Sequence, residues 1–458
     1  MIKGNGIETA AVRTQSRVAA SDGLDTVRQA ARRDKEMKFT ALLHHVTVDR
    51  LRKSYYALKR NAASGLDGVT WKAYGEELEQ RLQALHARIH RGRYRAIPGK
   101  RVYIPKPDGT ERPLSIWSLE DKIVQQAVVQ VMEAIYEQDF VGFSYGFRPG
   151  RSQHDALDAL VAGFYKRKVN WVLDADIRQF FDTMNHDWMM AFLEHRIRDK
   201  RLLRLIRKWL TVGVMEDGRR HRAEQGTPQG AVISPLLANI YLHYAFDLWS
   251  NAWREKMAAG DMIVIRYADD TVVGFQHKTD ADRYLQLLQD RLGKFGLMLH
   301  PNKTRLIQFG RFAAADCRRR GETKPPTFDF LGFTHYCTKA RKGGWFVVGR
   351  KTIRKRMRAT LREIKVQLRK RMHAPVAETG QWLNRLLRGH LNYFAVPGNW
   401  DSLKSFFSQV SWLWMRSLRR RSQRSRMTWS RFARLKKRFF PARSILHPWP
   451  NKRFAART

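Results

Sequence analysis

The sequence predicts an α+β body followed by a basic region built from helices alone. Up to about residue 338, strand patterns and helix patterns alternate irregularly, and only helical patterns follow. The charge changes near the same point: of a net charge of +44, residues 339–458 carry +29, with 32 Lys and Arg against three acidic side chains. We therefore expect acidic chemistry in the body and a binding surface in the helical region.

Composition excludes several classes of protein. The chain has 458 residues, 43% hydrophobic and 11% aromatic, so global disorder is not expected. Without a run of about 18 apolar residues or an apolar N-terminal segment, neither a membrane span nor a secretory signal is expected. The two cysteines, Cys317 and Cys337, exclude a disulfide scaffold and any zinc module with two Cys pairs. These features favour a reducing cytosol and a polyanionic partner, either nucleic acid or an acidic membrane face.

The elements of the body are predicted in chain order from periodicity and from helix breakers. Residues 1–38 are polar and are expected to form a flexible basic segment. Apolar residues at helical spacing predict helices over 39–60, 72–91, 119–138, 186–210, 236–249 and 279–295. Apolar runs of strand length predict strands over 102–105, 171–177, 262–267, 271–275 and 328–336, with a turn at 106–110. The stretch 312–326 is basic and rich in breakers, which favours a surface loop.

The region after residue 338 contains basic helical segments and an Arg-rich tail. Helices are predicted over 353–372, 379–394 and 402–418, and the tail begins at Arg419. Lys and Arg neutralise phosphates, and exposed aromatic rings stack on unpaired bases. The alternative is that these are ordinary solvated helical faces, with some of the tryptophans forming a core. The tryptophans concerned are Trp382, Trp400, Trp412, Trp414 and Trp429.

The clearest chemical signal is Tyr267-Ala268-Asp269-Asp270, at the tip of the predicted hairpin. Adjacent acids in apolar surroundings are costly unless a cation lies between them, and Mg²⁺ prefers such carboxylates together with phosphate oxygens. A third carboxylate on a neighbouring strand, Asp176 or Asp174, would complete a site for two metal ions about 3.5–4 Å apart. The alternative is that Asp-Asp is only a turn.

This run, preceded by Arg266, resembles the catalytic motif of reverse transcriptases. Further segments resemble group II intron reverse transcriptases, in the order that the family has. They are 104–114 (a fingers motif), 144–152, 176–182 (the strand with the first metal ligand), 225–230 with Ser234-Pro235, 301–304 and 330–333. Residues 383–394 resemble the maturase-specific domain of intron-encoded proteins, 445–454 resemble the tail of bacterial members, and 39–71 resemble their N-terminal extension. The chain is thereby identified as a member of the group II intron-encoded protein family.

The resemblance implies a right-hand polymerase fold with fingers, a palm with an antiparallel sheet, and an α-helical thumb. The expected domains are a flexible N-terminal segment (1–38), the N-terminal extension and start of the fingers (39–98), fingers and palm (99–338), thumb or maturase domain (339–418) and a basic DNA-binding tail (419–458). Many relatives carry an HNH endonuclease with Cys pairs. This sequence contains none, so second-strand cleavage by this chain is not expected.

For the catalytic centre, the resemblance implies that two Mg²⁺ ions are held by Asp176, Asp269 and Asp270, and it thus selects Asp176 over Asp174. The backbone carbonyl of Ile177 is expected to assist. Lys303 would protonate or only neutralise the pyrophosphate leaving group.

For the nucleotide, Lys106 and Arg112 flank a turn and suit a triphosphate, although surface charges are the alternative. An aromatic ring at Phe181 is expected to exclude a 2′-hydroxyl by bulk, with a core position as the alternative. Gln229 would contact the nucleotide and Gly230 would permit close backbone approach, unless the loop is only a helix cap.

For template and primer, the resemblance points to two motif arginines and two short segments, with a solvated surface or core packing as alternatives. These residues are Arg148, Arg151, Tyr267, Ala268, Leu331, Gly332 and Phe333. Five arginines of the helical region are expected to contact RNA, namely Arg385, Arg388, Arg419, Arg420 and Arg421.

The resulting hypothesis is an RNA-directed DNA polymerase and intron maturase of the bacterial cytosol, close to the nucleoid when it acts on DNA. It would bind its group II intron RNA, assist splicing and copy the intron from deoxynucleoside triphosphates at a DNA target (retrohoming), with no membrane partner. One alternative is an RNA-binding splicing factor with an idle polymerase centre. Another is a domesticated reverse transcriptase that acts in repair or defence without an intron.

Overall fold

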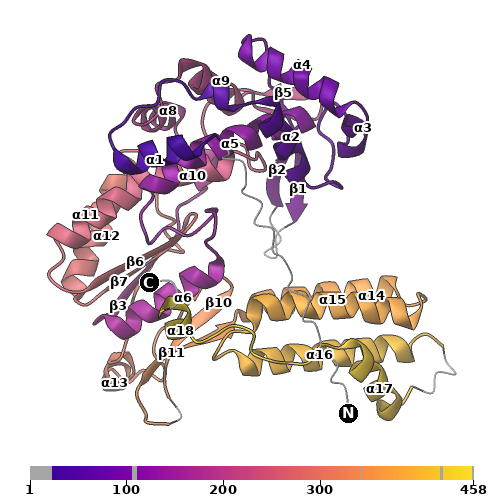
Figure 1. Cartoon of the computed structure of the whole chain (residues 1–458). Coiled ribbons are helices and arrows are strands. Elements are labelled where there is room, and N and C mark those ends of the chain that lie inside the picture. The colour runs from indigo at the N-terminus through magenta and orange to yellow at the C-terminus, as the bar shows by residue number, and fades with distance from the viewer. Residues whose placement is uncertain (1–22, 106–110, 341, 423–426, 456–458) are drawn as a thin grey trace, which may run out of the picture.

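The computed structural model describes residues 23–105, 111–340, 342–422 and 427–455 (Figure 1). Its strands form three sheets, with the orders β2-β1-β4-β5, β6-β7-β3-β8 and β11-β10-β9. The indigo and purple helices lie at the top of Figure 1, the β6-β7-β3 strands at the left, and the orange and yellow helices below. The predicted α+β body followed by a helical region is confirmed.

The second sheet, called the central sheet below, is antiparallel throughout. Its strands are β6 (Met262–Tyr267), β7 (Asp270–Phe275), β3 (Trp171–Ala175) and β8 (Arg305–Gln308). Successive residues of a strand point to opposite faces, so Val264 and Val273 belong to one core and Ile263 and Val272 to another. Because both faces are buried, β6 and β7 are continuous apolar runs, which is why the sequence shows them clearly.

Helices cover both faces of the central sheet. Helix α6 packs on one face, against β6, and α12 packs on the other, against β3 and β7. The covering elements are α6 (Gln153–Lys166), α10 (Ser234–Leu242), the π-helical turn η2 (His243–Asp247), α11 (Leu248–Lys256) and α12 (Lys278–Gly293).

The first sheet pairs β1 and β2 as a hairpin and adds β4 parallel to β1. Its strands are β1 (Gly99–Pro105), β2 (Glu111–Ile116), β4 (Val214–Glu216) and β5 (Arg219–His221). The long apolar helix α5 (Leu119–Asp139) contributes many buried side chains to the core beside this sheet. The other helices of this part are η1 (Leu43–His45), α2 (Val48–Ala57), α3 (Trp71–Gly75), α4 (Leu78–His90), α8 (His186–Glu194) and α9 (Lys200–Thr211).

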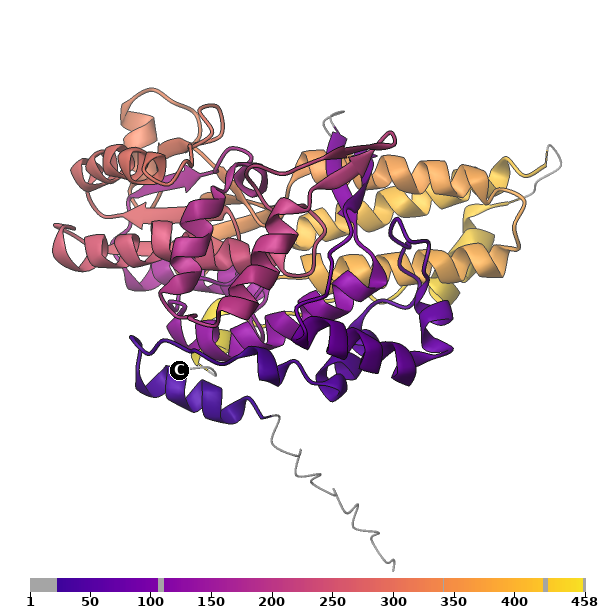
Figure 2. The same cartoon turned by 90° about the horizontal axis from the view of Figure 1, so that it is seen from above.

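The helical region lies at one end of the molecule, with the central sheet at the other (Figure 2). It contains α14 (Arg354–Lys370), α15 (Val376–Phe394), α16 (Trp400–Arg419) and α17 (Trp429–Phe439). Ile364, Leu383, Phe406 and Trp414 are among the buried side chains of its core. The third sheet links it to the body through β9 (Phe328–Phe330), β10 (Phe333–Lys339) and β11 (Phe346–Thr352).

Several elements differ from the sequence predictions. Within the segment 1–38, expected to be flexible, α1 (Asp25–Arg33) forms and packs on α5 through Val27 and Ala31. The predicted helix 186–210 is two helices, because the Asp199 carboxylate caps α9 by accepting from two backbone N–H groups. The stretch 312–326, expected to be a loop, contains α13 (Ala313–Arg319).

The tail 419–458, expected to bind DNA, packs on the rest of the protein in the part that the structure describes. Phe432 and Phe439 of α17 are buried in the core of the helical region. Further along, Leu446 N–H donates to the Ala395 carbonyl at 3.0 Å, and α18 (Pro450–Ala455) packs on α6 (Figure 1). Across the described residues, no helix combines the length and apolar character that spanning a bilayer requires.

Candidate active site

The aspartates singled out in the sequence meet at one end of the central sheet. The β6–β7 hairpin closes with the pair Tyr267–Asp270, so Ala268 and Asp269 form its turn. β3 pairs with β7 as far as Ala175 and Thr271, and Asp176 therefore leaves the sheet beside Asp270. Two separate segments thus bring three carboxylates to one place.

Burial and repulsion from neighbouring carboxylates disfavour the charged forms of Asp269 and Asp270. Burial raises the pKa of Asp270 to about 7, and the charges of Asp269 and Asp176 add to the effect. Burial likewise raises the pKa of Asp269, with repulsion from Asp176 in the same direction and attraction to Arg112 opposing it. A bound cation would relieve this repulsion and stabilise the ionised carboxylates.

Two basic side chains pair with Asp174, on β3, and with Asp176, which follows β3. Lys303 Nζ lies 2.7 Å from the Asp176 carboxylate, and Arg305 Nη2 lies 3.2 Å from that of Asp174. Burial raises the pKa of Asp174 to about 6, against the effect of Arg305. Ile177 follows Asp176 in a segment held by His300 N–H, which donates to the Asp176 carbonyl at 2.7 Å.

The donor set fits a hard divalent cation, because it offers only oxygen ligands and consists of carboxylates that repel one another. Among the described residues, no three His, Cys, Asp or Glu side chains already form a metal-binding arrangement. Lys303 holds the Asp176 carboxylate instead. Asp176, Asp269 and Asp270 are the residues that would hold the metal.

A chain of polar contacts lies on the nucleotide side of the site. Arg112 Nε, on β2, donates to Gln229 Oε1 at 3.1 Å. Gln229 Nε2 in turn donates to both carboxylate oxygens of Asp182 at 3.3 Å. Arg112 and Gln229, which the sequence analysis proposed from separate motifs, are therefore in direct contact. Lys106 lies outside the described residues.

Backbone contacts hold this arrangement in place. Gly230 has a φ of +107°, and a Cβ there would lie 2.5 Å from the Ser115 carbonyl of β2. Ser115 N–H donates to the Gln229 carbonyl at 2.7 Å, and Thr227 N–H donates to the Phe181 carbonyl at 2.7 Å. The close approach of the Ser115 carbonyl therefore requires glycine at position 230.

The two aromatic residues of helix α7 (Phe180–Thr183) lie in different environments. Phe180 is buried in the core, whereas Phe181 is only partly buried and meets Phe180 edge to face. Because Phe181 is not enclosed, its ring remains available at the edge of the site.

The family to which the chain belongs is shown by the match of residues 104–335, about half of its length, to "Reverse transcriptase (RNA-dependent DNA polymerase)". The chain is a member of the reverse transcriptase family. It is similar to Protein YkfC of Escherichia coli, with 36% identity over 239 residues that cover 46% of this chain and 62% of YkfC.

Two other relatives are named for introns. Group II intron-encoded protein LtrA of Lactococcus lactis subsp. cremoris is 35% identical over 191 residues, 42% of this chain and 32% of LtrA. The "Uncharacterized 91 kDa protein in cob intron" of Schizosaccharomyces pombe is 46% identical over 154 residues, 34% of this chain and 19% of that protein. The matched region spans less than two thirds of each of these three relatives.

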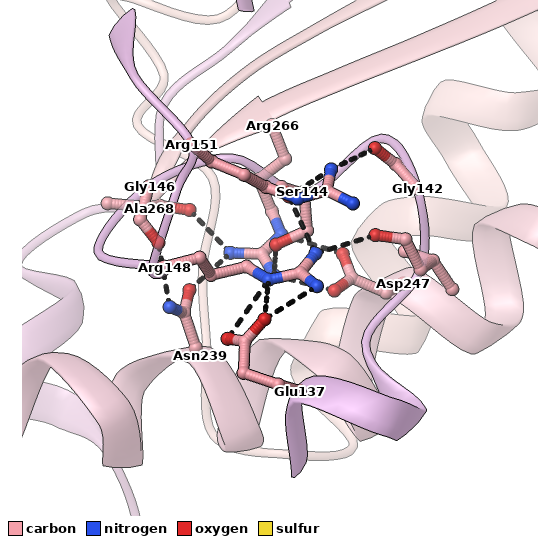
Figure 3. Close-up of polar contacts among 11 residues, drawn as sticks. Glu137, Gly142, Ser144, Gly146, Arg148, Arg151, Asn239, Asp247, Arg266 and Ala268 are labelled. Atoms are coloured by element: carbon pink, nitrogen blue, oxygen red, sulfur yellow. Dashed lines mark hydrogen bonds and ion pairs between the residues drawn. The ribbon is translucent and has the colours of Figure 1, made fainter. Parts of the chain in front are cut away.

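In this reverse transcriptase, Arg148 has a structural role instead of the predicted template contact (Figure 3). Its side chain is 3% exposed and pairs with Glu137 at 2.9 Å. It also donates to the carbonyls of Val141 and Ser144. Arg151 donates to the Gly142 carbonyl at 2.6 Å. Both arginines fasten the loop 141–148, because their N–H groups satisfy its backbone carbonyls.

The turn Leu331-Gly332-Phe333 joins β9 to β10 beside the helical region. Phe333 is fully buried, so its side chain packs in the core and does not reach a primer. Leu331 has a φ of +45° and its carbonyl accepts from the Tyr393 hydroxyl of α15 at 2.9 Å. Leu331 is partly exposed and keeps the predicted primer contact as a hypothesis.

The hairpin residues Tyr267 and Ala268 differ in exposure. Tyr267 is partly buried, with its ring 6.4 Å from that of Phe147, whereas Ala268 is buried with a φ of +55°. The Ala268 side chain is therefore enclosed, and the predicted primer contact there would have to be made by its backbone.

The structure also sorts the basic and aromatic residues of the helical region. Arg385, Arg388, Arg419 and Arg420 are exposed, while Arg421 is partly buried and donates to the Ala374 carbonyl. Trp414 is fully buried in the core. Trp400, Trp412 and Trp429 are exposed by 42%, 51% and 53%.

Sequence reasoning missed the buried network beneath the hairpin turn. It consists of Arg266, Asp247, Asn239 and Ser144, and Figure 3 shows its contacts with Ala268. One signal was present: Arg266 is a charged residue at the end of an apolar strand, so a buried counter-ion was required.

Proposed function

We propose that the chain is an RNA-directed DNA polymerase that acts by two-metal nucleotidyl transfer. The supporting observation is the convergence of Asp176, Asp269 and Asp270 at adjacent strand ends. Arg112 and Gln229 approach the same site from β2 and from the 225–230 loop. An RNA-binding protein without polymerase activity would not need three converging carboxylates beside this pair of side chains.

The side chains divide the work of the reaction. The three aspartates would hold Mg²⁺ ions, which would supply activation of the primer hydroxyl and stabilise charge on the triphosphate. Arg112 neutralises the triphosphate, and Phe181 excludes a 2′-hydroxyl by bulk. In this structure Lys303 contacts the Asp176 carboxylate. During the reaction it leaves this carboxylate and contacts the departing pyrophosphate, which it neutralises or protonates.

We propose further that the template is a group II intron RNA, that the chain assists its splicing, and that it copies the intron at a DNA target in a bacterial cytosol. The intron-associated relatives and the +29 charge of residues 339–458 support this. A cavity of about 350 Å³ lies between α14 and α16. Lys365, Arg369, Arg416 and Arg420 surround it together with the exposed Trp412, a combination that suits a nucleic acid with an unpaired base.

The polymerase proposal is tested by changing Asp269→Ala with Asp270→Ala. Primer extension on an RNA template should be abolished because the metal ligands are lost, while circular dichroism and the melting temperature show a folded protein. Substantial residual extension would refute the assignment of these ligands.

The intron proposal needs a separate test. A group II ribozyme sequence should flank or enclose the coding region, and its transcript should splice faster at low Mg²⁺ when the protein is added. If the ribozyme sequence is absent, the intron proposal fails and the polymerase proposal stands.

A further inference from the structure

Arg266 is a buried cation directly below the aspartate-bearing turn, and its charge is balanced inside the protein. The side chain is 0% exposed, as is that of its partner Asp247. Arg266 Nε and Nη2 donate to the two carboxylate oxygens of Asp247 at 2.6 and 2.5 Å, which forms a forked pair. An arginine in such a place would be very unfavourable without this partner.

The remaining N–H groups of Arg266 connect the turn to its surroundings (Figure 3). Nη1 donates to Asn239 Oδ1 at 3.1 Å and to the Ala268 carbonyl at 2.9 Å. Nη2 also donates to Ser144 Oγ at 2.7 Å. One guanidinium therefore bridges helix α10, the loop 141–148 and the hairpin turn.

The bond to Ala268 bears on the direction of the aspartates. Ala268 has a φ of +55°, a left-handed conformation that is unfavourable for a residue with a Cβ. Its carbonyl lies in the same rigid peptide plane as the N–H of Asp269. Whatever orients this carbonyl therefore orients the backbone from which Asp269 leaves the turn.

The π-helical turn η2 explains how Asp247 reaches Arg266. Asn239 and Asp247 are eight residues apart, and in a regular α-helix at about 100° per residue their side chains would point about 80° apart. A π turn accommodates one extra residue, and this returns the two side chains to within about 20° of one another. Both then face Arg266, as their hydrogen bonds show.

We propose that Arg266 is a positioning residue of the polymerase centre, with Asp247 as its required counter-charge. It holds the left-handed turn at Ala268 so that Asp269 and Asp270 are presented to metal together with Asp176. The inference rests on the proposed function and adds to its site a group that touches neither metal nor substrate.

The test compares two buried Arg–Asp pairs of the same protein. Arg266→Lys keeps the charge and removes the forked geometry. The matched control is Arg350→Lys, because Arg350 of β11 pairs with Asp158 of α6 at 3.3 Å with both side chains no more than 5% exposed. Both variants should lower the melting temperature. Only a positioning role changes the aspartate site selectively.

Two measurements on the full chain without primer, template or nucleotide report on that site. Mn²⁺ titration followed by electron paramagnetic resonance should show at least tenfold weaker binding for Arg266→Lys and unchanged binding for Arg350→Lys. Hydrogen–deuterium exchange should rise in residues 262–275 for Arg266→Lys alone. In primer extension, kcat should fall while the KM for nucleotide stays constant, because Arg112 and Gln229 are untouched.

Unchanged Mn²⁺ binding in Arg266→Lys, or equal weakening in Arg350→Lys, would overturn the proposal. If Arg266→Lys does not fold, Asn239→Ala removes a neutral partner and should still weaken Mn²⁺ binding at least threefold. An unchanged Mn²⁺ dissociation constant in Asn239→Ala would also refute the proposal. A wild-type protein that binds Mn²⁺ at this site but does not extend primers would refute the proposed function and leave this inference intact.

Discussion

Phe180 and Phe181 are adjacent residues with different environments, and the difference carries a chemical consequence. Phe180 is enclosed in the core, so its replacement would cost stability. Phe181 is partly exposed at the end of α7, near the Asp182 carboxylate that holds Gln229. Under the proposed function, the bulk of this ring would limit the space for a 2′-hydroxyl.

Phe181→Ala should raise ribonucleotide incorporation about tenfold or more relative to deoxyribonucleotide, because the space for a 2′-hydroxyl opens. A tenfold change in relative kcat/KM corresponds to about 1.4 kcal/mol. Phe181→Tyr keeps the bulk and is the control, with selectivity close to wild type. Single-nucleotide primer extension with each sugar measures the ratio, and an unchanged ratio in Phe181→Ala would contradict the role.

At the scale of elements, the loop 141–148 is built to support the β6–β7 hairpin. Phe143 carbonyl and Tyr145 N–H bond to the backbone of Arg266, and Gly146 lies against the turn itself. A Cβ on Gly146 would lie 2.2 Å from the Ala268 nitrogen, whereas a Cβ on Gly142 would meet nothing within 4 Å. Position 146 of this loop therefore requires glycine, whereas position 142 has room for a Cβ.

Gly146→Ala should therefore displace the turn, reduce primer extension at least tenfold and cost about 1–3 kcal/mol of stability through overpacking. Gly142→Ala, four residues earlier in the same loop, should have wild-type activity. Extension rates and urea unfolding measure the two effects. Equal activity of both variants would show that the loop does not constrain the turn.

Elements with a strong local pattern were predictable, and those that depend on distant partners were not. The hairpin was clear because each of its strands contains an apolar run, residues 262–265 in β6 and Val272-Val273 in β7. Helix α6 was missed although Ser152 and Asp155 form a capping box before its apolar residues. The break at Asp199 was missed because its carboxylate also accepts from Leu42 and Leu43, which lie far away in the chain.

The same reasoning applies to the site. Asp269 and Asp270 followed from their spacing, but Asp174 and Asp176 are two residues apart in the predicted strand 171–177 and would share a face, so only the family resemblance separated them. The family motif indicated a template contact for Arg148, whereas its partner, Glu137, lies near the end of α5 and outside that motif. An ion pair between residues of different segments cannot be predicted from the local sequence.

At the scale of the whole molecule, the net charge is distributed unevenly between the body and the helical region. The body carries +15 around an acidic centre, and residues 339–458 carry +29 with few acids. In the helical region, exposed Trp412 lies in the basic cavity between α14 and α16, with the Arg416 guanidinium 5.2 Å from its ring centre. Exposed Trp429, on α17, lies outside the residues that line this cavity.

Trp412→Ala should weaken binding of single-stranded RNA about fivefold to 100-fold, since stacking of one base is worth about 1–3 kcal/mol. Trp429→Ala is the matched control and should bind like the wild type. Fluorescence anisotropy at one fixed salt concentration measures both. Equal affinities for all three proteins would show that the cavity does not take a base.

The chain segment that returns from the helical region to the body has a consequence for the timing of folding. His447 stacks on His154 with ring centres 3.9 Å apart, and each imidazole bonds to a backbone carbonyl of α15. These contacts tie α6 to α15 through residues synthesised about 110 positions after the end of the reverse transcriptase match. At about 5–20 residues per second, a ribosome needs roughly 6–22 s to cover that interval. During that interval the contact between His447 and His154 cannot form, so a nascent chain does not yet have α6 joined to α15 through it.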